Sequence, residues 1–126
     1  VSCFLGDRFT ATVPVAANRP YWFENTQGNQ ISCIGDTAVW TLFGEADDHF
    51  TWQSYPGEFG EECRDFWVAE KKCTEEVTEF ILGSDTCYEY VSCDNTVRYC
   101  LYDEQYGHQI PWNYFSQATM EWFMSF

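Results

Sequence analysis

The chain has two histidines, His49 and His108, and imidazoles are the side chains best suited to move a proton near neutral pH. A small secreted ribonuclease combines such a base and acid with an arginine that holds the phosphate. The side chains that could complete this set are Glu58, Glu62, Arg64 and Arg98. Their spacing follows no diagnostic motif. A ribonuclease-like hydrolase is therefore one hypothesis, and we assign no catalytic residue.

Two oxygen-rich turns, Asp47-Asp48 and Asp94-Asn95, carry the ligand types that calcium prefers. Neither has the spacing of a calcium-binding loop. The sequence also lacks the G-x-S-x-G pattern of a serine nucleophile. We therefore predict no metal site and no cofactor.

Carbohydrate binding is the chemistry that these residue types favour. Sugars present apolar C–H faces and a rim of hydroxyls, which suit an aromatic ring beside short polar side chains. In the segment 49–55, His49, Thr51 and Gln53 alternate with Phe50 and Trp52. The residues predicted to bind a glycan are Asp47, Asp48, His49, Trp52, Tyr55, Trp112 and Asn113.

Aromatic side chains are unusually abundant, with 6 Trp, 8 Tyr and 11 Phe in 126 residues. One small core does not need so many rings, so we expect at least one tryptophan to be exposed. Rings that line an internal pocket are the alternative. That arrangement would indicate a non-enzymatic effector, an inhibitor or a small-ligand carrier.

Seven cysteines indicate a chain that folds under oxidising conditions, because reducing compartments keep thiols unpaired. None is spaced C-x-x-C, so zinc-ribbon and thioredoxin sites lack their signature. We predict a secreted, extracellular protein from which a signal peptide has been removed. We expect Cys3 and Cys33 each to be paired. The odd thiol is either free or joins a second chain.

The charge is strongly acidic, with 20 Asp and Glu against 6 Lys and Arg, a formal net charge of −14. Residues 44–104 hold 16 of these acids and only 4 of the bases. Such a field repels phosphate backbones and anionic lipids, so we predict no nucleic-acid partner. No apolar run reaches 18 residues, so we also predict no membrane insertion.

The elements that must position these residues read as one α+β domain spanning 1–126. We predict a strand over 4–13, a short helix over 15–18, and a hairpin that pairs 37–43 with 49–55. A helix is predicted over 61–73, since Cys63, Phe66, Trp67 and Cys73 recur at helical spacing.

The second half of the chain completes the predicted sheet. Residues 86–92 and 96–102 are predicted strands joined at Asp94-Asn95, the segment 77–82 is a strand or a helix, and the tail after Trp112 favours a helix. We expect the sheet to be mainly antiparallel. Disulfides should staple the 61–73 helix to the hairpin that follows it.

The opening Val1-Ser2-Cys3-Phe4-Leu5-Gly6-Asp7, the absence of N-glycosylation sequons and the acidic, aromatic composition resemble small secreted fungal proteins. In size and element order the chain is similar to mushroom glycan-binding proteins with an αββαβ arrangement and a homodimeric sheet. The resemblance covers general organisation and supplies no binding residue. It implies a homodimeric lectin with a defensive role, whose partners are glycans or glycoproteins of other organisms.

Overall fold

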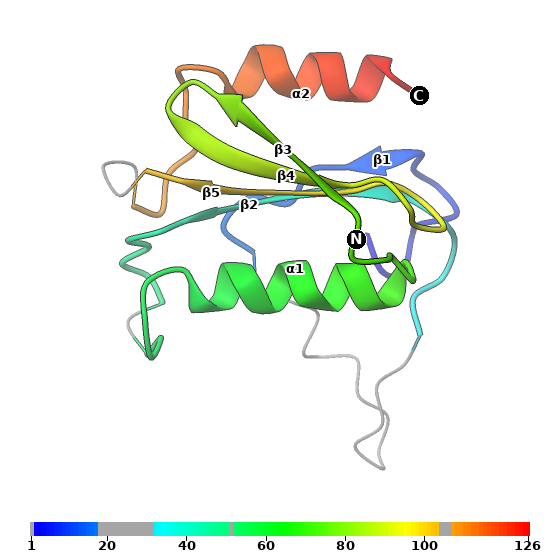
Figure 1. Cartoon of the computed structure of the whole chain (residues 1–126), viewed down its shortest axis with the longest axis horizontal. Coiled ribbons are helices and arrows are strands. Elements are labelled where there is room, and N and C mark those ends of the chain that lie inside the picture. Colours follow the sequence, from blue (N-terminus) through cyan, green and yellow to red (C-terminus); the bar gives the residue numbers. More distant parts are fainter. Residues whose placement is uncertain (1, 18–31, 51, 104–106) are drawn as a thin grey trace.

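The computed structural model describes residues 2–17, 32–50, 52–103 and 107–126, and its centre is the strand β2, Ala38–Gly44. All seven residues of β2 are buried. A strand reads as a continuous apolar run when both faces of its sheet are covered, and here α1 and α2 cover opposite faces (Figure 1). The expected α+β class is confirmed.

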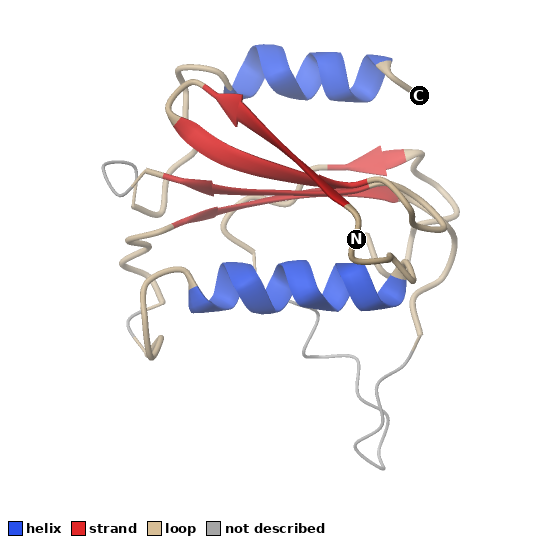
Figure 2. Cartoon of the chain, viewed as in Figure 1, coloured by secondary structure: helices blue, strands red, loops and turns tan. Residues whose placement is uncertain are grey.

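The sheet has five strands in the order β1-β2-β5-β4-β3 (Figure 2). The elements are β1 Ala11–Thr12, β2 Ala38–Gly44, α1 Glu58–Glu70, β3 Val77–Leu82, β4 Asp85–Tyr90, β5 Val97–Tyr102 and α2 Phe115–Met124. β3, β4 and β5 pair antiparallel, whereas β2 pairs parallel with both β1 and β5. The sheet is therefore mixed, with its antiparallel part in the second half of the chain.

The predicted hairpin between 37–43 and 49–55 does not form. β2 already has β1 on one side and β5 on the other, so no edge is free for the segment 49–55. That segment instead forms the loop that leads into α1, and Thr51 lies outside the described residues. The predicted strand over 4–13 is reduced to Ala11–Thr12. In the predicted helix over 15–18, Val15 instead forms an isolated β-bridge with Leu42, and Asn18 lies outside the described residues.

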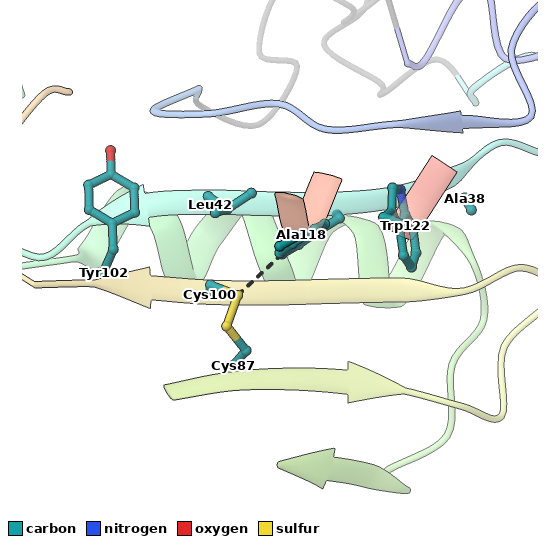
Figure 3. Packing of buried hydrophobic residues seen from close by; sticks show 8 residues of the cluster. Ala38, Leu42, Cys87, Cys100, Tyr102, Ala118 and Trp122 are labelled. Atoms are coloured by element: carbon teal, nitrogen blue, oxygen red, sulfur yellow. Dashed lines mark hydrogen bonds between the residues drawn. A yellow bond between two sulfur atoms is a disulfide. The ribbon is translucent and has the colours of Figure 1, made fainter. Parts of the chain in front are cut away.

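Alternate residues of β2 supply the two halves of the core, because side chains along a strand point to opposite faces. Ala38, Trp40 and Leu42 pack toward α2, beside Ala118 and Trp122 (Figure 3). On the other face, the buried partners from α1 are Phe59, Cys63 and Trp67, which pack with Val39, Phe43, Val97 and Tyr99. The predicted C-terminal helix is thus confirmed, and it covers one face of the sheet.

The helix α1 runs from Glu58 to Glu70, three residues earlier than predicted at each end. Gly57 precedes it at φ 81°, a conformation that glycine adopts without a Cβ penalty. Beyond Glu70 the backbone turns, with Lys72 at φ 51°. Cys73 therefore leaves the helix, and the prediction that Cys63 and Cys73 share a helix face is wrong.

Three disulfides are present: Cys3–Cys33, Cys73–Cys93 and Cys87–Cys100. Cys73–Cys93 joins the segment after α1, and not the helix itself, to the β4–β5 turn, so only one disulfide connects the helix region to the hairpin and it starts beyond the end of α1. Cys87 and Cys100 are direct partners across β4 and β5. The odd thiol is Cys63, which is free and 1% exposed. It cannot reach a second chain in the folded protein, so it does not make a covalent dimer.

Neither described helix is long and apolar enough to span a membrane.

Candidate functional site

The candidate site lies at the end of the sheet where β2 and β5, two neighbouring strands, both finish. The two strands run parallel, and Gly44 and Tyr102 are register partners at their last positions. The segments that follow them therefore leave the same end of the sheet side by side, at the left of Figure 1. Gly44 permits this approach, because a Cβ there would collide with the carbonyl oxygen of Gly107 and with the Tyr102 ring.

The carboxylate of Asp47 joins these two segments. Its side chain is completely buried, and its Oδ1 atom accepts the backbone N–H of His49 at 3.0 Å. The Nδ1 atom of His108 lies 2.9 Å from Oδ1 and 2.7 Å from Oδ2. A buried carboxylate is costly to desolvate unless such partners surround it. This pair therefore fixes the two segments to each other.

The second histidine stacks on the first. The ring centroids of His49 and His108 are 3.9 Å apart, and the planes differ by 23°. His49 Nδ1 also lies 3.1 Å from Asp48 Oδ1, and the hydrogen bond with His49 lowers the pKa of the exposed Asp48 carboxyl. Two imidazoles and two carboxylates thus meet at one point on the surface.

Aromatic rings continue the site toward α1. The Phe50 ring is 5.5 Å from the Trp52 ring and 5.7 Å from the Phe59 ring, and it also contacts His108 at 5.7 Å. Gln53 fixes the loop to the start of α1, since its Oε1 atom accepts the N–H of Phe59 at 3.2 Å. The Trp52 ring therefore contacts the Phe50 and Phe59 rings, while 66% of the residue stays exposed to solvent.

An open depression of about 310 Å³ lies among these groups. Its lining residues are Glu45, Ala46, Asp47, Phe50, Gln53, Ser54, Tyr55 and Pro56. The Tyr55 hydroxyl donates to Glu61 at 2.7 Å, and this bond raises the pKa of Tyr55. Glu45 also lines a second cleft, of about 390 Å³, with Glu61, Arg64 and Tyr88. The two hollows are therefore neighbours on one acidic surface.

The structure brings together five of the seven predicted glycan-binding residues. Asp47 and Tyr55 line the depression, Asp48 and His49 lie at its histidine end, and Trp52 stands against Phe50. The other two, Trp112 and Asn113, precede α2, and the Asn113 amide packs beside Gly83 in the β3–β4 turn. Trp52 and Trp112 are 66% and 62% exposed, which confirms the expectation of an exposed tryptophan.

His108 is absent from the residues predicted to bind a glycan, although it contacts Asp47 directly. The two are separated by 61 positions, and only the parallel pairing of β2 with β5 brings them together. Phe50 and Gln53 were predicted to lie on opposite faces of a strand, yet both line the depression.

Comparison with protein-family models, with curated proteins and with solved structures finds no match to this chain. The functional argument therefore depends on the geometry and chemistry of the described residues.

The two arginines considered for phosphate binding are engaged elsewhere. Arg98 forms an ion pair with Glu89, and its guanidinium carbon lies 4.5 Å from the Trp122 ring centroid and 5.1 Å from that of Trp40. The Arg64 guanidinium lies over the Tyr99 ring and donates to Asp65 at 2.8 Å. The groups at the histidine pair are acids instead, so its surroundings disfavour a phosphate.

Proposed function

We propose that this chain is a secreted, non-catalytic carbohydrate-binding protein that holds a glycan in the depression beside Trp52 and Tyr55. One observation carries the proposal: a largely exposed tryptophan packs against Phe50, and Phe50 lines an open hollow together with Asp47, Gln53 and Tyr55. Three disulfides are typical of proteins that fold in an oxidising, extracellular-type environment, which supports the secreted location.

A sugar ring suits this arrangement better than a fully apolar ligand does. The exposed face of Trp52 offers an apolar surface for the C–H groups of a pyranose, and the hydroxyl rim can bond carboxylate and amide oxygens. Glu45 and Gln53 supply such acceptors in the hollow. Because Phe50 and Phe59 support the Trp52 ring, little side-chain entropy is lost on binding.

The acidic surface narrows the class of glycan. Glu45 and Asp47 line the depression, the exposed Asp48 lies beside His49, and the whole chain carries a formal charge of −14. Sulfated, phosphorylated or sialylated glycans would be repelled by this field. The ligands we propose are therefore neutral or amine-bearing sugars.

A defensive lectin that acts on glycans or glycoproteins of other organisms is the biological role that fits this proposal. A homodimer would present two sites and raise the avidity for a surface that carries many glycans. Sedimentation equilibrium at micromolar concentration tests this part of the proposal separately. A monomer at all concentrations would contradict the dimer and leave the site intact.

A ribonuclease-like hydrolase is the second candidate, because His49 and His108 do meet at the surface. The two arginines considered for phosphate binding, Arg64 and Arg98, are paired with Asp65 and Glu89, and the acids beside the histidines oppose a phosphate. We therefore rank it below glycan binding. Cleavage of RNA by the wild-type chain but not by His108→Ala would reverse this order.

The test of glycan binding is an array of neutral, amine-bearing and acidic glycans, followed by calorimetry with the best ligand. Trp52→Ala should weaken binding at least about tenfold, because a central aromatic contact is lost. Phe9→Ala is the matched control: Phe9 is 45% exposed and lies beside β1, at the opposite end of β2 from Gly44. No binding on the array, or equal binding by Trp52→Ala, would contradict the proposal.

A further inference from the structure

Three side chains at the end of β2 and β5 form a set of ligand atoms that could hold a metal ion. Asp47, His49 and His108 each offer one ligand atom, and these atoms lie within 4.8 Å of one another. Asp47 and His49 come from the segment after β2, whereas His108 comes from the segment after β5. The set therefore exists only in the folded chain.

From this cluster we propose that Asp47, His49 and His108 bind one divalent transition-metal ion of the zinc type. Two imidazole nitrogens and one carboxylate oxygen are a common protein ligand set for Zn²⁺, and a water molecule commonly fills the fourth position. Calcium and magnesium prefer sites built from oxygen atoms alone, so a set with two imidazoles discriminates against them.

The positions of the ligands are set before the ion arrives. Asp47 is buried and fixed by the backbone N–H of His49 and by His108 Nδ1. His108 is also packed against the Phe50 ring. Asp47 and His108 are thus held close together before the ion binds, which reduces the entropy lost on binding.

The third ligand, His49, must move to reach the ion, and its exposed side chain allows this. Tetrahedral ligand atoms about 2.1 Å from an ion lie about 3.4 Å apart. The ligand atoms of the cluster lie within 4.8 Å of one another, so its wider pairs must close. The 2.7 Å contact between Asp47 Oδ2 and His108 Nδ1 must instead open. The His49 side chain is 66% exposed, so it can turn toward the ion without disturbing the core.

The local charge favours a cation at this point. Asp48 lies 3.1 Å from His49, and Glu45 lines the adjoining depression. A bound ion would offset part of this acidic excess. It would also cross-link the 45–50 loop to the segment that leads into α2.

The experiment uses the complete chain with its disulfides intact, treated with a chelator and then titrated with zinc chloride in a calorimeter. We expect one saturable site per chain and none for calcium chloride. His49→Ala should weaken zinc binding more than about tenfold, because it removes a ligand and even the loss of a group that only orients a ligand commonly costs about 10–100-fold. Zinc should also raise the melting temperature of the wild type more than that of His49→Ala.

Glu75→Gln is the matched control, because it removes an exposed acid that is outside the cluster and should bind zinc as the wild type does. His49 is exposed, so its alanine variant is expected to fold, and its melting temperature without zinc checks this. The absence of a single zinc site, or equal affinity in His49→Ala and the wild type, would overturn the proposal. Neither result depends on glycan binding, which Trp52→Ala tests separately.

Discussion

Asp47 and His108 are 61 positions apart in the sequence, yet the Oδ2 atom of one lies 2.7 Å from the Nδ1 atom of the other. The contact joins the ends of two parallel strands that are neighbours in the sheet. It fixes the loop that carries Trp52 relative to the segment that leads into α2. The candidate glycan site and the candidate metal site both depend on this one pair.

Replacing Asp47 should therefore destabilise the fold. Asp47→Ala removes the acceptor of the His49 N–H and of His108 inside a buried site, and the expected cost is about 1–3 kcal/mol. Asp48→Ala is the control, because the Asp48 side chain is 79% exposed and the change should cost less than about 0.5 kcal/mol. Urea denaturation measures both values. Equal costs would contradict a structural role for Asp47.

A second prediction concerns Arg98, which fixes α2 to the sheet. Its guanidinium lies among the rings of Trp40, Phe80 and Trp122 and forms an ion pair with Glu89. Arg98→Met keeps much of the apolar stem but leaves the Glu89 charge without its partner. The expected loss of stability is about 1–3 kcal/mol, because removing one partner of a partly buried pair leaves the other charge unpaired.

The double variant Arg98→Met with Glu89→Met separates charge from packing. It removes the stranded carboxylate, so it should be more stable than Arg98→Met alone in the same denaturation assay. A double variant that is less stable than the single one would show that the ion pair is not the source of the effect.

Local sequence signals predicted the second half of the fold well. The antiparallel strands β4 and β5, the turn at Asp94-Asn95 and the two helices follow from periodicity and turn residues that lie close together in the chain. The parallel pairing of β2 with β5 has no such signal, because its partners are almost half the chain apart in the sequence. The run Ala38–Gly44 is apolar for a reason that only the tertiary structure shows, since helices cover both of its faces.

In the candidate site, too, the contacts between residues near in sequence were predictable and the contact across the sheet was not. Asp47, Trp52 and Tyr55 were predicted from residue type, and they are neighbours because one loop carries them. The predicted strand alternation over 49–55 was wrong, since the edge of β2 that it required is occupied. His108 joins the site through the crossover between β2 and β5. Its position could not be predicted from residue spacing.

A third prediction concerns the reactivity of Cys63. Burial raises the pKa of its thiol, and the thiolate is the reactive form, so Cys63 should be inert in the folded chain. A thiol reagent under native conditions should label less than one tenth of the chains within minutes. In denaturant without reductant, the same reagent should label one thiol per chain. Rapid native labelling would contradict the buried position of Cys63, and three disulfide-linked peptide pairs in a digest provide the control.

The last prediction concerns Tyr99 and alkaline pH. The Tyr99 hydroxyl is buried without a hydrogen-bond partner among the described residues, and burial raises its pKa above the ordinary value of 10.0. The unfolded chain therefore loses this proton first as pH rises, so stability is fully present below about pH 10 and falls above it. Burial raises the pKa of Tyr102 in the same direction.

The stability of Tyr99→Phe should match that of the wild type or exceed it by up to about 1 kcal/mol at neutral pH, because the substitution removes an unsatisfied polar group. Urea denaturation from neutral pH to about pH 11 should then give a shallower decline for Tyr99→Phe. An identical decline in both proteins would show that Tyr99 is not a source of the alkaline sensitivity.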